Sequence, residues 1–187
     1  MQGQTRPGPR QVQFRRTPTL VREALLARAM ARPRLPNARA IITVDMVYNI
    51  LVNQVHPDLR HYFYEYSWIF DYYYFVPLKS ELDEFLSKWR EDTLPNLAYK
   101  IELFDCDDFA ELFAVEAKKQ LNTNSVGIAL GLLEAYGAYT WHAWNVAIVN
   151  DNGDLKAVCI EPQLGEPVSC TGTSFDNITY YMVAAII

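Results

Sequence analysis

The sequence predicts an α+β domain in which N-terminal helices are followed by an antiparallel sheet. Between residues 43 and 121, apolar side chains recur at intervals of three and four, which is typical of helices with one buried face. After residue 125 the pattern changes to β-rich runs separated by turn residues, which is typical of strands. Half of the 187 residues are hydrophobic, so the chain can build a core of its own.

The first 40 residues differ in charge from the rest of the chain. They hold nine arginines and one acidic residue, a net charge of +8, whereas residues 41–187 carry −13. A division this large usually separates a tail from a folded body. We therefore expect a basic arm over residues 1–40, largely disordered or with one short helix, and a catalytic domain over residues 41–187. No apolar run reaches the ~20 residues that a membrane span needs.

Three helices are predicted in the first half of the body. They cover residues 43–54, 80–92 and 106–121. Ser80 and Asp83 have the spacing of a capping box at the start of the second helix. Asp105 is expected to cap the third helix, whose first turn is acidic and whose last turn holds two lysines, as the helix dipole favours.

Residues 62–75 form a Tyr-rich segment between the first two helices. Six tyrosines, three phenylalanines and one tryptophan stand among its 14 residues. The segment either packs beneath the body or lines a groove. Both uses are compatible with aromatic side chains, which combine a large apolar surface with a polar tip.

Four strands are predicted after residue 125. They cover residues 126–133, 139–150, 155–161 and 178–187. Residues 151–154 read Asp-Asn-Gly-Asp, a strong signal for a tight hairpin turn. With the turn centred on residues 152–153, residue 142 falls opposite residues 162–164. His142 and Glu161 are therefore expected to lie close together.

Three residues in this framework form a candidate catalytic set. Cys106 begins a helix, where the dipole favours a thiolate. His142 lies within a strand and could exchange protons with that thiol. Glu161 ends the next strand and could orient the imidazole. The predicted roles are nucleophile for Cys106, base for His142 and orienting acid for Glu161; Cys159 is expected to be structural.

The order of these motifs resembles that of papain-like and transglutaminase-like cysteine enzymes. With Glu161-Pro162, the runs Phe-Asp-Cys-Asp-Asp-Phe (104–109) and His-Ala-Trp-Asn (142–145) look most like the C-terminal protease domain of the Marasmius-type fungal agglutinins. The resemblance covers residues 43–165. It implies a papain-like fold and a cysteine hydrolase, a thiol protease that cleaves peptide or amide bonds of a peptide or protein substrate.

Acidic residues around Cys106 raise a metal hypothesis. Like charges oppose a thiolate, and a divalent cation would remove that penalty. The resemblance also implies calcium dependence, with Asp108 as the first candidate ligand and Asp107 and Glu102 as weaker ones. Hard oxygen ligands suit Ca²⁺ or Mn²⁺. The alternative is that the acids only stabilise the helix N-terminus and bind nothing.

Two further functions stay open at this stage. One is transglutaminase or amidase acyl transfer on the same three residues. The other is a non-catalytic binding module, with the Tyr-rich segment as contact surface and the basic arm as a tether to nucleic acid or another anionic surface. A free catalytic thiol prefers a reducing compartment, which predicts a cytoplasmic location.

Overall fold

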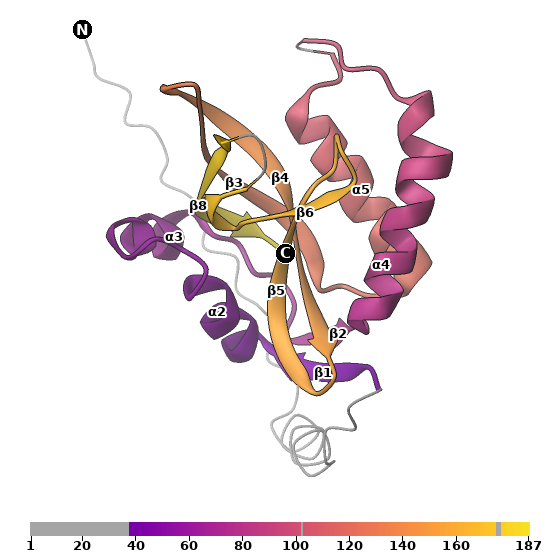
Figure 1. Ribbon diagram of the computed structural model, residues 1–187. Helices are drawn as coiled ribbons and strands as arrows, with labels where there is room; N and C mark the ends of the chain where they lie inside the picture. Colours follow the sequence, from indigo (N-terminus) through magenta and orange to yellow (C-terminus); the bar gives the residue numbers. More distant parts are fainter. Residues whose placement is uncertain (1–37, 102, 175–176) are drawn as a thin grey trace, which may run out of the picture. The chain divides into compact units, whose positions relative to one another are not determined.

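A computed structural model describes residues 38–101, 103–174 and 177–187 (Figure 1). The chain divides into two units, Met1–Pro33 and Arg34–Ile187. Most of the predicted basic arm lies outside the described residues, so its disorder, its helix and its tether role stay predictions. Within the described part, no helix is both long and apolar enough to cross a membrane.

The described α-helices flank the sheet and include the three that the sequence predicts. They are α2 (Val44–Val52), α3 (Arg60–Tyr66), α4 (Lys79–Lys88) and α5 (Cys106–Leu121), with short turns η1 (Pro57–Leu59), η2 (Trp89–Thr93) and η3 (Leu94–Asn96). Thr43 is the N-cap of α2 and Asp105 that of α5, as expected. The Asp108 carboxylate accepts the backbone N–H of Asp105 at 3.1 Å, which closes the first turn of α5.

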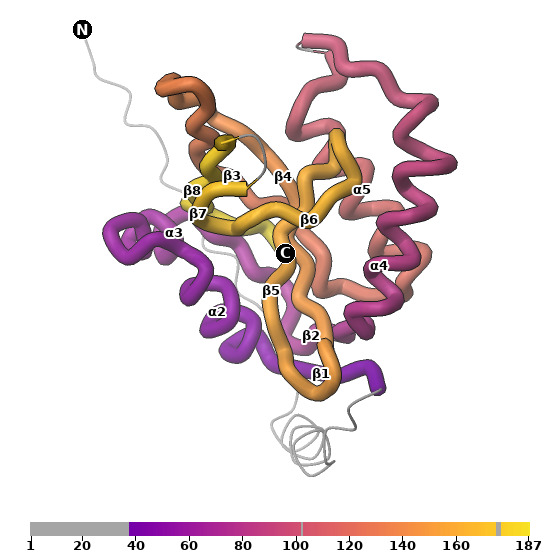
Figure 2. Tube along the Cα trace, viewed as in Figure 1, coloured from indigo at the N-terminus to yellow at the C-terminus, as the bar shows by residue number. Residues whose placement is uncertain are grey.

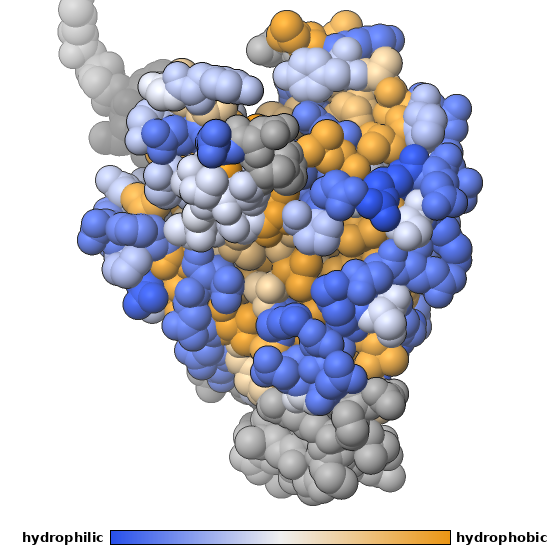
Figure 3. Space-filling view, viewed as in Figure 1, coloured by the Kyte–Doolittle hydropathy of each residue, from blue (hydrophilic) through white to orange (hydrophobic). Residues whose placement is uncertain are grey.

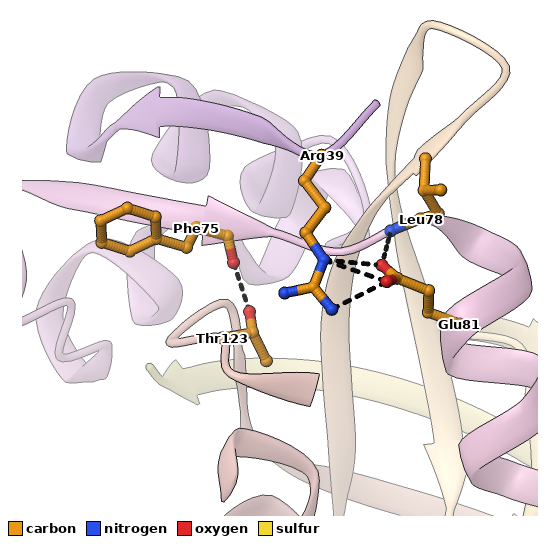
Figure 4. Close-up of polar contacts among 5 residues, drawn as sticks. All are labelled: Arg39, Phe75, Leu78, Glu81 and Thr123. Carbon is orange, nitrogen blue, oxygen red and sulfur yellow. Dashed lines mark hydrogen bonds and ion pairs between the residues drawn. The ribbon is translucent and has the colours of Figure 1, made fainter. Parts of the chain in front are cut away.

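The predicted capping box of α4 is wrong by two residues. Leu78, not Ser80, is the N-cap, and its N–H donates to Glu81 Oε2 at 2.8 Å. Arg39 holds the same carboxylate through two of its guanidinium nitrogens (Figure 4). Asp83 pairs with a lysine one turn earlier instead. The cap of α4 is therefore a contact over three residues, and Arg39 from before β1 binds the same carboxylate.

Two antiparallel sheets make up the rest of the fold. The small sheet pairs β1 (Ala40–Thr43) with β2 (Tyr73–Val76). The large sheet has the order β6-β5-β4-β3-β8-β7, from β3 (Val126–Ala135), β4 (Ala138–Asp151), β5 (Asp154–Glu161), β6 (Glu166–Val168), β7 (Thr171–Thr173) and β8 (Thr179–Ile186). The Thr123 hydroxyl donates to the Phe75 carbonyl, which ties β2 to the loop after α5 (Figure 4).

The β4–β5 hairpin forms as predicted. Asn152 and Gly153 both have positive φ, 55° and 96°, as a two-residue turn of the primed type requires. Asn145 lies opposite Ile160 in the resulting register. If the same pairing is continued beyond Asn145, His142 falls opposite the residues that directly follow β5.

A disulfide draws the two ends of the large sheet together. Cys159 lies on β5, next to the edge strand β6, and Cys170 directly precedes β7 at the opposite edge. The Cys170 carbonyl also accepts the Met182 N–H of β8 at 3.1 Å. The sheet curls into a half-barrel. In Figures 1 and 2, strands β5 and β6 from one side of the sheet lie near β8 from the other side.

Each face of the curled sheet carries its own apolar cluster. Trp144, Tyr180 and the disulfide lie in the cluster that α2 and the small sheet cover. The second cluster holds α4 and α5 against the opposite face, with Trp89 and Phe113 in edge-to-face contact. The two faces follow the alternation of side chains along β4.

This architecture corrects the predicted fold class. A papain-like (transglutaminase-like) fold with N-terminal helices followed by a sheet was expected, but the described residues form chiefly one curled antiparallel half-barrel with a few helices. A strand, β1, precedes the first described helix. Strands β1, β2, β6 and β7 have three or four residues each, too few for an alternating pattern to reveal them.

Candidate functional site

His142 and Glu161 meet as the sequence predicts. Their side chains are only 12% and 5% exposed, and His142 Nε2 donates to Glu161 Oε2 at 2.7 Å. The Tyr180 hydroxyl donates to the same oxygen at 3.2 Å, and the Gln163 N–H donates to Oε1 at 3.3 Å. Three donors therefore satisfy one buried carboxylate, which makes the group a well-connected structural network.

Among the described residues, no hydrogen bond joins Cys106 to His142 or Glu161. Its half-buried sulfur is close to backbone N–H groups of Ala143 and Asp107. The face of β4 that receives α5 carries Asn145, whose amide donates to the Ala110 carbonyl at 2.8 Å. His142 instead lies with Trp144, their rings 6.0 Å apart. The structure thus joins His142 to Glu161 directly and places the Cys106 sulfur at the backbone of Ala143, the residue after His142.

The surroundings of Cys106 favour the neutral thiol. Burial raises the pKa of Cys106, and the nearby Asp105 and Asp107 carboxylates raise it further. The backbone N–H groups of Ala143 on β4 and of Asp107 in the first turn of α5 lower the pKa but do not reverse the shift. The contributions that disfavour the thiolate therefore outweigh those that favour it.

The carboxylates beside Cys106 bear on the metal hypothesis. Ligand atoms of Asp105, Cys106 and Asp107 lie within 4.8 Å of one another, and a hydrogen bond with Asp105 raises the pKa of Asp107. Asp108 is engaged in the helix cap, and Glu102 lies outside the described residues. A cation could be held by Asp105 and Asp107, so Ca²⁺ or Mn²⁺ binding stays a prediction.

The thiol and the metal can be tested together by alkylation. We expect iodoacetamide to modify Cys106 with a midpoint above pH ~8.5, the value of an unperturbed thiol, and to leave the disulfide-bonded Cys159 and Cys170 unmodified. Bound Ca²⁺ should lower the midpoint by offsetting the carboxylates. Mass spectrometry at each pH, in calcium or chelator, reads both effects. A midpoint below pH ~8.5 in chelator would contradict the neutral thiol, and an unchanged midpoint in Ca²⁺ and Mn²⁺ would exclude the metal.

An aromatic pocket of about 510 Å³ lies between α3 and the large sheet. It is lined by Tyr62, Tyr66, Leu130, Trp141, Val183 and Ala184. Trp141 is 70% exposed, so its ring is accessible from solvent. The volume lies within the range of about 300–1,000 Å³ that is usual for small-molecule sites. Sequence reasoning missed this pocket, although the tryptophan beside His142 on a strand with buried neighbours was a usable signal.

The Tyr-rich segment serves both of the purposes that the sequence left open. Phe63 and Tyr74 are buried in the core, whereas Tyr64, Trp68 and Phe70 are more than half exposed. Figure 3 shows one face of the molecule, on which hydrophobic residues are visible among polar ones. Of this segment, Tyr62 and Tyr66 line the pocket.

The comparisons with known proteins point to agglutinins. The sequence model of the family described as "Agglutinin C-terminal" matches residues 74–167. No curated protein matches the chain. A solved structure titled "PSL1a-E64 complex" has a TM-score of 0.55 and 23% identity, over 79% of this chain and 51% of that one. A Polyporus squamosus lectin, bound to the epitope Neu5Aca2-6Galb1-4GlcNAc, has a TM-score of 0.43 and 23% identity, over 65% and 41%.

These findings correct the predicted activity. The chain spans about half the length of the first of these structures and shares its fold. The matching family is one of agglutinin domains, so the prediction of a cysteine hydrolase or transglutaminase acting on a peptide or protein is wrong. The alternative of a binding module is the one that the family favours.

Proposed function

Because the chain belongs to the family of agglutinin C-terminal domains, we propose that it is a non-catalytic module that binds carbohydrate. The observation that carries the proposal is the aromatic pocket, in which Trp141 faces solvent beside two tyrosines of α3. The C–H groups on one face of a pyranose ring are weakly positive and are attracted to the negative face of an aromatic ring. The sugar hydroxyls then remain free to bind water or polar groups at the rim.

The contacts around the pocket support a preformed site. Tyr62 and Tyr66 stack with ring centroids 6.2 Å apart, and α3 is anchored by the buried Phe63. His142 follows Trp141 on β4, and its hydrogen bond to Glu161 holds this part of the strand in place. Little ordering is then needed when a ligand binds, which favours affinity.

The first test is binding to an array of neutral and sialylated glycans, followed by calorimetry on the best of them. We expect Trp141→Ala to weaken binding at least ~30-fold, because an aromatic anchor in a pocket typically contributes 2 kcal/mol or more. Trp141→Phe keeps a ring and should retain part of the affinity.

The matched control is Trp68→Ala. Trp68 is 61% exposed, similar to Trp141, but it does not line the pocket. It should therefore leave affinity unchanged. Equal losses in the two variants would place binding elsewhere, and no binding to any glycan on the array would overturn the proposal.

A further inference from the structure

The aromatic pocket has a floor that does not suit a sugar. Leu130, Val183 and Ala184 supply it, and no charged side chain lines the pocket. The polar atoms of the lining side chains are two tyrosine hydroxyls and one indole N–H. Sugar hydroxyls placed on the floor would lose their hydrogen bonds to water and find few replacements, which is unfavourable. An uncharged apolar group would meet no such penalty.

The rim has the opposite character. Trp141 and Tyr66 are 70% and 53% exposed, and the tyrosine hydroxyls can donate and accept hydrogen bonds. Flat aromatic faces with polar tips suit a ligand portion that is partly apolar and partly hydrated. The pocket therefore has two zones, a hydrated aromatic rim and an apolar floor.

A β-bulge builds the floor. The register between β3 and β8 shifts between Leu130 and Gly131, where Leu130 pairs with Ala184 and Gly131 with Met182. Val183 is thus the extra residue on β8. Successive side chains on a regular strand point to opposite faces, but here both Val183 and Ala184 line the pocket. The irregularity therefore enlarges the apolar surface of the floor.

We propose that the pocket binds an amphiphilic glycoside, an uncharged sugar whose apolar alkyl or acyl chain occupies the floor while the sugar stacks at the rim. The absence of charged residues from the lining selects against a charged group inside the pocket. The cavity of about 510 Å³ has room for several methylene groups as well as a ring. This inference rests on the proposed carbohydrate binding and names the ligand class of the same site.

The test is a calorimetric titration with alkyl β-glucosides and alkyl β-galactosides from methyl to octyl, below their micelle concentrations. We expect affinity to rise up to about fourfold for each added methylene, the value for complete burial of that group, until the floor is filled. Val183→Phe should fill the floor and flatten this rise, so that octyl glycosides bind no more tightly than methyl glycosides to this variant. If Val183→Phe does not fold, Ala184→Leu fills the floor with a smaller side chain and should also flatten the rise.

Straight-chain alcohols of the same lengths separate the two proposals. A rise with chain length for glycosides, with weaker binding of the alcohols, supports the amphiphile. Methyl and octyl glycosides of equal affinity would overturn the apolar-chain inference and leave carbohydrate binding intact. Alcohols that bind as tightly as glycosides would overturn both proposals, because the sugar would then contribute nothing. No binding of any probe would also count against both.

Discussion

Removal of the Cys159–Cys170 disulfide is expected to lower the free energy of unfolding by about 3 kcal/mol. The two cysteines are 11 residues apart, and a cross-link over a loop of this length restricts the unfolded chain by about that amount. The folded state is also affected, because the bridge joins β5 to the segment that leads into β7 at the other end of the sheet. The half-barrel would lose the covalent link between its two sides.

The measurement is urea unfolding of Cys159→Ala/Cys170→Ala beside the wild type with and without dithiothreitol. For a chain of this length, the loss corresponds to a fall of roughly 6–12 °C in Tm. Cys106→Ala is the matched control, since it removes the free thiol and leaves the bridge. If the double variant and the reduced wild type were as stable as the oxidised wild type, the disulfide would not be formed in solution.

The same disulfide bears on where the chain folds. Disulfides persist in oxidising compartments and are rare in reducing ones. The bridge is at odds with the cytoplasmic location expected for a free catalytic thiol, and that location stays a prediction.

Caps and turns could be predicted, because residues next to one another in the sequence form them. The 16 residues of α5 begin at the expected cap, and the Asn152-Gly153 turn sets the register that brings His142 to Glu161. The short strands were not predictable, because three or four residues cannot display an alternating pattern. The cap of α4 was missed because its N-cap is Leu78, whose apolar side chain gives no capping signal.

The candidate site was predictable only in part, for a similar reason. Hairpin geometry relates His142 to Glu161, but the position of Cys106 depends on how α5 packs against the sheet. The pocket depends on a bulge in β8 that pairs with β3, more than 50 residues earlier in the chain. Trp141 was visible in the sequence as a neighbour of His142, yet only the tertiary fold sets it against Tyr62 and Tyr66.

The His142→Ala substitution should destabilise the protein by about 1–3 kcal/mol, the cost of taking one hydrogen-bond partner from a buried polar group. Glu161 would remain 5% exposed at the end of β5, with its closest donor gone. Tyr180 would then be the remaining side-chain donor to the carboxylate among the described residues. Burial and Glu161 both raise the pKa of Tyr180, so its hydroxyl stays a donor at neutral pH.

A double-mutant cycle of His142→Ala with Tyr180→Phe tests whether the two donors act as one network. Both donate to Glu161 Oε2, so we expect a coupling free energy of roughly 0.5–3 kcal/mol in urea unfolding. His56→Ala is the control, because His56 is exposed and caps only a three-residue turn; its cost should stay below about 1 kcal/mol. Additive effects of the two network substitutions would mean that Glu161 binds its donors independently. A cost for His142→Ala no larger than that of His56→Ala would mean that the buried pair does not hold the end of β4, and that Trp141 is positioned by other contacts.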